Sequence, residues 1–107
     1  MTPFAQLVIL QEQVAEEVTQ RYEGGYVYIL RCRDGSLYTG AARNVMRRLE
    51  QHRRGKGSRY VASRLPCELV HIEGHKTWSA ALKREAYIKG QPVSYKRALV
   101  ARSESAQ

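Results

Sequence analysis

The dipeptide Asp34-Gly35 gives this sequence its firmest structural signal. It separates residues 26–32 (Tyr-Val-Tyr-Ile-Leu-Arg-Cys) from residues 37–40 (Leu-Tyr-Thr-Gly), and both segments have the β-branched and aromatic composition of strands. Because Asp-Gly favours tight turns, we expect an antiparallel hairpin. A turn of two or four residues would place Tyr28 and Tyr38 on opposite faces, whereas a three-residue turn, Asp34-Gly35-Ser36, would place them on one face.

Hydrophobic spacing and end signals predict the other elements. We expect a third strand at residues 67–73, and helices at residues 3–21, 45–53, 78–89 and 95–101. The candidate N-caps are Asn44, Thr77 and Ser94. This order predicts an α/β (α+β) domain whose central three-stranded, mainly antiparallel sheet is flanked by helices. The chain is expected to divide into an N-terminal helical extension (residues 1–24), the domain (residues 25–101) and a C-terminal tail (residues 102–107).

Charge is distributed unevenly along the 107 residues, whose formal net charge is +8. Residues 1–24 contain four Glu and one Arg, whereas residues 43–64 contain eight Arg and Lys side chains and one acidic side chain, Glu50. A cluster of one sign repels itself unless an anion relieves it, so we expect a nucleic-acid backbone as the partner. A solubilising face or an acidic protein partner is the alternative. The candidate nucleic-acid contacts are Arg43, Arg47, Arg53, Arg54, Lys56, Arg59 and Tyr60.

Three polar residues interrupt apolar helix faces. Arg48 and His52 project beside the stripe formed by Val45 and Leu49, and Glu85 lies within the apolar face of the next long helix. A core-facing carboxylate is costly unless it is paired or binds a metal. The structural alternatives are a snorkelling Arg48, a satisfied border His52 and a salt bridge from Glu85 to Arg48 or Lys89. Together, however, the three supply what phosphodiester hydrolysis requires: a cation, a proton acceptor and a metal-holding carboxylate.

The sequence also bears on compartment. It contains no apolar run of the roughly 18 residues that a membrane span needs, and it shows no secretory signal. The two cysteines, Cys32 and Cys67, have no disulfide-framework spacing, which suits small core residues in a reducing compartment. We therefore expect a cytoplasmic protein without membrane contact. Residues 1–24 are the segment that offers a surface for self-association.

These motifs together resemble the signature of the GIY-YIG nuclease superfamily, and in particular its small stand-alone bacterial members. Tyr26-Val-Tyr28 and Tyr38-Thr-Gly40 resemble its paired motifs, and Arg48 and His52 follow Tyr38 at the family's spacings of ten and fourteen residues. The segment 81–89, which contains Glu85, looks like the family's metal-binding helix, and residues 55–60 resemble a loop of the stand-alone members. The resemblance covers about residues 25–100, and it departs from the family pattern at Tyr26, Thr39 and Ala41.

The resemblance implies a metal-dependent phosphodiesterase with DNA as substrate. Tyr28 would be the general base or would align the attacking water, and Tyr38 would orient the phosphate. Arg48 would stabilise charge on the phosphoryl oxygens, while His52 would relay the proton or hold Tyr28. Glu85 would bind Mg²⁺ or Mn²⁺. Since a tyrosine with a pKa of about 10 is a poor base, we expect Arg48 and a bound cation to lower the pKa of Tyr28.

Three functions follow as hypotheses. The leading one is a Mg²⁺-dependent DNA endonuclease, structure-selective or non-sequence-specific, that acts in DNA repair or recombination. It would hold single-stranded or branched DNA mainly through contacts to the phosphates. The second is a nucleic-acid-binding module with this fold and little or no catalysis. The third is a protein-interaction domain that uses residues 1–24. The set Tyr28, Tyr38, Arg48 and Glu85 favours the enzyme, because a binding module has no need for an inward Glu85.

Overall fold

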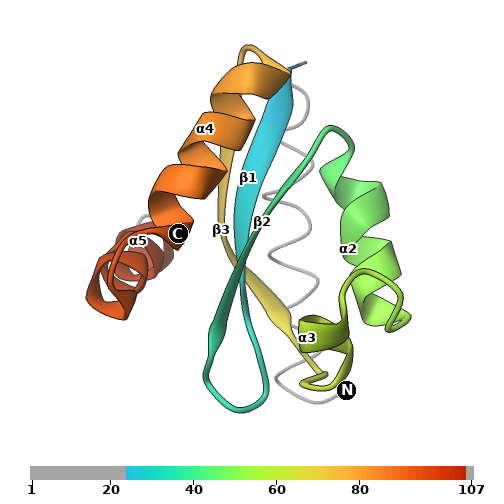
Figure 1. Ribbon diagram of the computed structural model, residues 1–107. Coiled ribbons are helices and arrows are strands. Elements are labelled where there is room, and N and C mark those ends of the chain that lie inside the picture. The colour runs from blue at the N-terminus through green and yellow to red at the C-terminus, as the bar shows by residue number, and fades with distance from the viewer. Residues whose placement is uncertain (1–23, 106–107) are drawn as a thin grey trace.

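The computed structural model describes residues 24–105, so the helix expected at residues 3–21, most of the N-terminal extension and residues 106–107 lie outside the described part. Figure 1 shows the described elements in chain order. They are β1 (Gly25–Arg31), β2 (Leu37–Ala42), α2 (Val45–Arg53), α3 (Arg59–Ala62), β3 (Glu68–His75), α4 (Trp78–Lys89) and α5 (Val93–Ser105). The three strands form one antiparallel sheet in the order β2-β1-β3, which confirms the expected α+β architecture.

The β1–β2 hairpin closes through a three-residue turn. The Cys32 amide donates to the Ser36 carbonyl at 2.9 Å, and the Gly35 amide donates to the Cys32 carbonyl at 2.9 Å. Gly35 has a φ of +84°, the left-handed conformation that glycine adopts without strain. The loop residues are therefore 33–35, one position earlier than expected. Tyr28 pairs with Gly40 and Leu30 pairs with Tyr38, so the two tyrosines share one face of the sheet.

A separate hydrophobic core covers each face of the sheet. Side chains at alternate positions of a strand point to opposite faces. On one face, Tyr26, Tyr28 and Leu30 of β1 pack with buried residues of α2 and α3. On the other, Val27 and Ile29 pack with buried residues of α4 and α5. Figure 1 accordingly shows α2 and α4 on opposite sides of the sheet, and both helices contact the edge strand β2.

Two predicted helix starts are confirmed. The Asn44 side chain accepts from the Arg47 amide at 3.0 Å, and the Thr77 hydroxyl accepts from the Ala80 amide at 3.1 Å. The prediction for the last helix is wrong at both ends: α5 starts at Val93, which places Ser94 inside the helix, and it continues to Ser105. Residues 102–105, expected as part of a tail, are thus helical. β3 is also two residues longer than expected at its C-terminal end.

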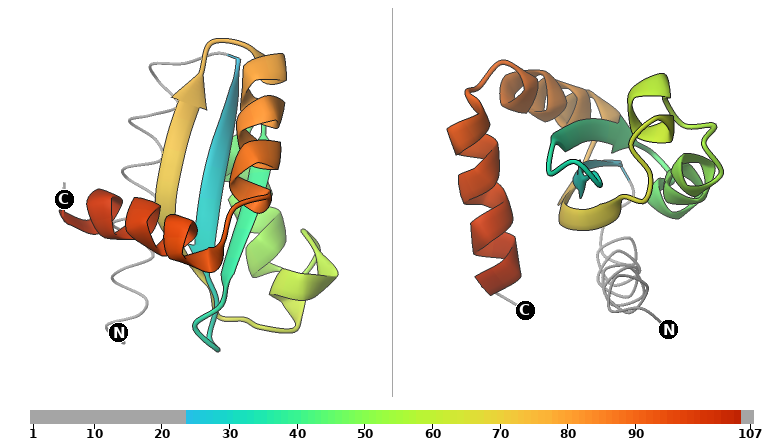
Figure 2. Two further views of the ribbon diagram at one scale, coloured as in Figure 1. Left: turned by 60° about the vertical axis from the view of Figure 1, so that its left-hand side comes forward. Right: turned by 90° about the horizontal axis from the view of Figure 1, so that it is seen from below.

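A polar network fixes α4 and α5 to β3 on the face away from α2. Arg84 of α4 donates from Nε to Glu73 Oε1 at 2.8 Å and from Nη1 to the Tyr95 hydroxyl at 3.0 Å. Burial raises the pKa of Glu73, but hydrogen bonds from His71, Arg84 and His75 outweigh burial and hold that pKa at about 2. In Figure 2, α5 runs across the direction of α4. The network therefore gives α4, which carries Glu85, a fixed place against the sheet.

None of the helices formed by residues 24–105 is long and apolar enough to cross a membrane.

Candidate functional site

The site is built around Tyr28, whose ring lies over a glycine of the neighbouring strand. Tyr28 is 1 % exposed and pairs with Gly40 of the edge strand. A Cβ placed on Gly40 would lie 2.5 Å from both Cζ and Oη of Tyr28. Only a residue without a side chain leaves room for the ring there. The glycine of the Tyr38-Thr-Gly40 motif thus has a steric role in the site.

Tyr28, Tyr38 and His52 form one aromatic cluster. The Tyr28 hydroxyl lies 2.8 Å from His52 Nε2, a buried hydrogen bond whose direction depends on the imidazole tautomer. The Tyr38 ring centroid lies 5.4 Å from that of His52 and 6.5 Å from that of Tyr28. The loop after α2 closes over the imidazole, since a Cβ at Gly57 would collide with the His52 ring. Three predicted site residues are therefore in mutual contact.

The protonation of this cluster differs from the expectation. Burial is the largest influence and raises the pKa of Tyr28 above its usual value; Tyr38 raises it further, and the lowering by the charge and hydrogen bond of Arg48 is smaller. Arg48 therefore acts in the expected direction, but without a bound cation its effect is smaller than that of burial. Burial, aided by the Arg48 charge, lowers the pKa of His52 to about 4. At neutral pH the pair is a protonated tyrosine and a neutral imidazole.

Arg48 and Glu85 belong to helices on opposite faces of the sheet, and the charges of both act on Tyr28. Arg48 of α2 acts on Tyr28 through its charge and a side-chain hydrogen bond, and the Glu85 carboxylate of α4 acts on it through its charge. Arg48 also donates from Nη1 to the Gln51 side chain at 3.2 Å. Glu85 forms an ion pair with Lys89 Nζ at 3.4 Å, and 20 % of its side chain is exposed. Of the two salt bridges considered for Glu85, the structure contains the one to Lys89.

A groove of about 360 Å³ runs along the β2 edge between α2 and α4. Arg43, Arg47 and Arg48 contribute its positive charge, and Trp78 contributes an aromatic wall. The Arg43 guanidinium lies 5.2 Å from the Trp78 ring centroid. A groove with three guanidinium groups at its walls suits an anionic backbone that passes the Tyr28 site.

The other predicted nucleic-acid contacts occupy the α2–α3 side of the site. Arg53, Arg54, Lys56 and Arg59 are exposed. Glu50 forms ion pairs with Arg53 at 3.8 Å and with Arg54 at 3.0 Å, so part of this charge is balanced within α2. Tyr60 is 38 % exposed, and its ring stacks on Tyr38 at 6.1 Å. The predicted contacts thus border the site on two sides. Sequence reasoning missed three residues of the site: Gly57 against the His52 ring, Gln51 bonded to Arg48, and Trp78 beside Arg43. Gly57 and Gln51 lie near their partners in the chain, but no local pattern indicates these contacts, and Trp78 is distant in sequence from Arg43.

In the described part of the chain, the site offers a divalent cation a single protein carboxylate as ligand. Within residues 24–105, no group of three or more His, Cys, Asp or Glu side chains is placed to hold a metal ion. Glu85 is instead a single, part-buried carboxylate close to the Tyr28 site. Mg²⁺ is commonly bound through one or two carboxylates, with water and substrate phosphate oxygens completing its octahedron. The residues present therefore fit a cation that is held jointly with a phosphate substrate.

Burial of neutral His52 predicts a pH dependence of stability. The pKa of His52 falls from 6.5 to about 4 in the folded state, so the unfolded chain binds more protons between these values. The contribution to the free energy of unfolding is complete above pH 6.5 and is lost as the pH falls to 4, by about 3 kcal/mol at most. Urea unfolding of the wild type and His52→Gln at pH 7.0, 5.5 and 4.5 measures it. The free energy of unfolding of the variant should fall less steeply with decreasing pH than that of the wild type. An equal pH dependence in the two proteins would contradict a buried neutral imidazole.

Comparison with known proteins assigns the chain to a family. Residues 24–97 match the model of the GIY-YIG catalytic domain. A UPF0213 protein from Staphylococcus aureus strain Mu3 is 53 % identical over 64 residues, which cover 60 % of this chain and 78 % of that protein. The protein from strain N315 matches to the same extent. The solution structure of a UPF0213 protein from Bacillus halodurans, with 39 % identity and a TM-score of 0.49, covers 72 % of this chain and 82 % of that one.

The matched region runs from the start of β1 into α5 and so includes every residue of the site described above. The chain belongs to the GIY-YIG family, a family of nuclease-type catalytic domains.

Proposed function

We propose that this protein is a metal-dependent DNA endonuclease of the cytoplasm, structure-selective or non-sequence-specific, that acts in DNA repair or recombination. The observation that supports it most is that the charges of Arg48 and Glu85 both act on Tyr28, from helices that lie on opposite faces of the sheet. A guanidinium can stabilise the charge that develops on phosphoryl oxygens. A carboxylate would oppose the binding of a polyanion unless a cation lies between them. In a module that only binds DNA, Glu85 would serve the ion pair with Lys89 but would weaken the attraction of the site for phosphate.

The cluster also suggests a path for the proton. Water attacks the phosphorus atom and passes its proton to the Tyr28 oxygen, while Tyr28 passes its own proton to Nε2 of neutral His52, in the tautomer that carries its proton on Nδ1. The P–O bond to the leaving oxygen breaks, and that oxygen takes a proton from solvent. Because burial raises the pKa of Tyr28, this relay avoids a free tyrosinate. It assigns Tyr28 the role of aligning the water and relaying its proton.

Arg48 and Tyr38 position the phosphate in this scheme. Arg48 lines the groove and reaches the Tyr28 site, so its guanidinium is placed to hold non-bridging oxygens. Tyr38 lies against His52 and orients the same group through its hydroxyl. Glu85 would hold Mg²⁺ or Mn²⁺, which supplies further neutralisation of the phosphate charge when bound.

Cleavage of labelled single-stranded, duplex and branched DNA tests the proposed function. We expect strand cleavage in Mg²⁺ or Mn²⁺ and none in chelator, with one of the three DNA forms cut fastest. Cleavage that persists in chelator would contradict the role of the metal. DNA binding without cleavage in either metal would support the nucleic-acid-binding module instead.

The exposed arginines should contribute to binding more than to the rate. Arg54 is the exposed C-cap residue of α2 and forms an ion pair with Glu50. We therefore expect Arg54→Ala to weaken DNA binding by about threefold through the loss of one phosphate contact. The single-turnover rate at saturating DNA should stay within a factor of two. Titrations at several salt concentrations, combined with rapid-quench cleavage, separate the two effects. A large loss of rate with unchanged affinity would place Arg54 in the reaction.

A further inference from the structure

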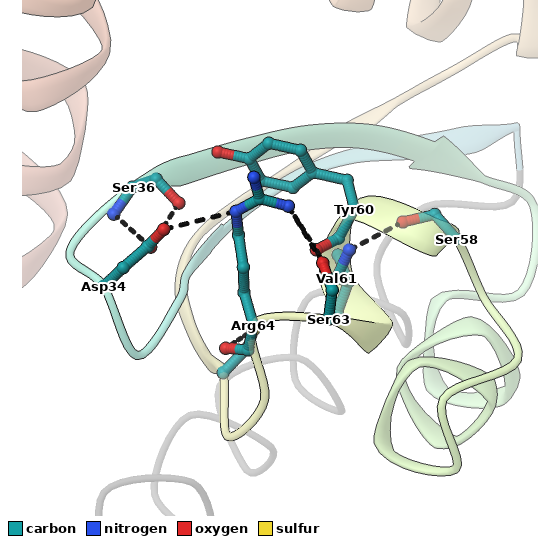
Figure 3. A network of polar contacts seen from close by, with 8 residues as sticks. Asp34, Ser36, Ser58, Tyr60, Val61, Ser63 and Arg64 are labelled. Carbon is teal, nitrogen blue, oxygen red and sulfur yellow. Dashed lines mark hydrogen bonds and ion pairs between the residues drawn. The ribbon is translucent and has the colours of Figure 1, made fainter.

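A polar network connects the hairpin loop to the segment that follows α3, and the proposed reaction does not use it. Figure 3 shows Arg64 at its centre, with the guanidinium alongside the Tyr60 ring. Arg64 donates from Nε to Asp34 Oδ2 at 3.2 Å, and from Nη1 to the Tyr60 carbonyl at 3.1 Å and to Ser63 Oγ at 3.0 Å. Its Cζ lies 3.8 Å from the Tyr60 ring centroid. Three hydrogen bonds and a stacking contact thus hold one long side chain in place.

Hydrogen bonds hold the Asp34 carboxylate in place and favour its charged form. The carboxylate accepts a hydrogen bond from the Ser36 amide at 3.0 Å, and hydrogen bonds from Ser36, followed by the charge of Arg64, lower the pKa of Asp34. The Arg33 amide also donates to the Arg64 carbonyl at 3.0 Å. Since an exposed ion pair alone contributes little, it is the combination with backbone contacts and stacking that fixes Arg64.

Stacked side chains continue from Arg64 to the site. The Tyr60 ring contacts both Arg64 and Tyr38, and the Tyr60 and Tyr38 ring centroids are 6.1 Å apart with an interplanar angle of 24°. Tyr38 in turn lies against His52 at 5.4 Å. We call Asp34, Arg64, Tyr60 and Tyr38 the stacked column. Its far end touches the cluster that contains Tyr28, and its near end is the hairpin loop.

We propose that Arg64 is a positioning residue that holds Tyr60 on Tyr38 and thereby fixes the Tyr38 ring against His52. The link to catalysis rests on the proposed function, whereas the effect on the rings does not. A planar guanidinium can lie flat on a ring while its edge donates several hydrogen bonds, whereas a tetrahedral ammonium has no planar face to stack. A displacement of about 1 Å at a reacting group can lower a rate by up to about 100-fold. A small shift of Tyr38, transmitted from Arg64 through Tyr60, would therefore be enough to lower the rate of cleavage.

The first experiment observes the rings in the free protein. NMR spectra of protein with ¹³C-labelled tyrosine rings would be compared for the wild type, Arg64→Met and Asp34→Asn. We expect both variants to shift the Tyr60 and Tyr38 ring signals and to weaken the cross-peaks between them. Arg33→Met removes an exposed arginine of the same loop outside the column and should change neither ring. Unchanged Tyr38 signals in a folded Arg64→Met protein would overturn the proposal.

The second experiment separates positioning from contact with DNA. At saturating DNA we expect Arg64→Met to lower the single-turnover rate about tenfold and Asp34→Asn about threefold, each with unchanged affinity, and Arg33→Met to leave the rate unchanged. If Arg64 instead held a phosphate, Asp34→Asn would release the Arg64 guanidinium from its ion pair and tighten DNA binding. Tighter binding by Asp34→Asn would therefore overturn the proposal. Wild-type protein that cuts no DNA would refute the proposed function, and the ring signals would still decide whether Arg64 positions Tyr38.

Discussion

Replacing Arg48 with alanine should lower the single-turnover rate of DNA cleavage by about 100- to 1,000-fold, the usual loss for one group that stabilises developing charge. Arg48 is the guanidinium of α2 that both lines the groove and interacts with Tyr28. Its removal also takes away the hydrogen bond to the Tyr28 hydroxyl. Rapid-quench assays at saturating DNA measure the effect on the chemical step separately from binding.

Two variants serve as controls for Arg48. Arg48→Lys keeps the charge but loses the planar donor fork, so we expect an intermediate rate. Arg47→Ala removes the adjacent groove arginine, which is exposed, and should weaken binding more than it lowers the rate. A rate for Arg48→Ala within tenfold of the wild type would show that another cation handles the phosphate charge.

Substituting Gly40 with alanine should damage the site through sterics alone. The added Cβ would lie 2.5 Å from Cζ and Oη of Tyr28, so the ring must leave its position beside His52. We expect cleavage to fall by about 100-fold because Tyr28 and His52 are displaced. Overpacking of this kind should also lower the free energy of unfolding by about 1–3 kcal/mol. Single-turnover cleavage and urea unfolding measure the two effects.

Gly90→Ala is the matched control. Gly90 has a φ of −79°, and a Cβ there would come no closer than 3.6 Å to the Ala86 and Tyr87 carbonyl oxygens. We expect it to leave cleavage unchanged and to keep or slightly raise the free energy of unfolding, because alanine restricts the unfolded chain. If Gly40→Ala cut DNA as fast as Gly90→Ala does, cleavage would not depend on the position of the Tyr28 ring over Gly40.

Short-range signals predicted the elements well where one residue type decides a boundary. Asn44 and Thr77 stand at the starts of α2 and α4 as expected, because an N-cap oxygen serves amides two or three residues away. α3 was missed, since four residues are too few to display a helical period even with Ser58 as its cap. α5 runs past the expected end because residues 102–105 contain no stop signal.

The site was predicted as a set of residues and not as a geometry. The turn sequence left open whether Tyr28 and Tyr38 share a face, and the register, which depends on how the whole chain packs, decided it. Arg48 lowers the pKa of Tyr28, as expected, but burial by residues distant in sequence raises that pKa more, and the sequence did not indicate how deeply the ring is buried. The roles of Gly40 and Gly57 follow from rings that lie against them, which no local pattern indicates.

The most direct test of a metal-dependent nuclease is single-turnover cleavage by wild type and Glu85→Gln in Mg²⁺, on the DNA form that wild type cuts fastest. Glu104→Gln, which changes an exposed carboxylate of α5 that pairs with Arg31, serves as the control. We predict that wild type and Glu104→Gln cut at the same rate and that Glu85→Gln cuts at least about 100-fold more slowly, with its fold intact. Cleavage by Glu85→Gln at the wild-type rate would contradict the account.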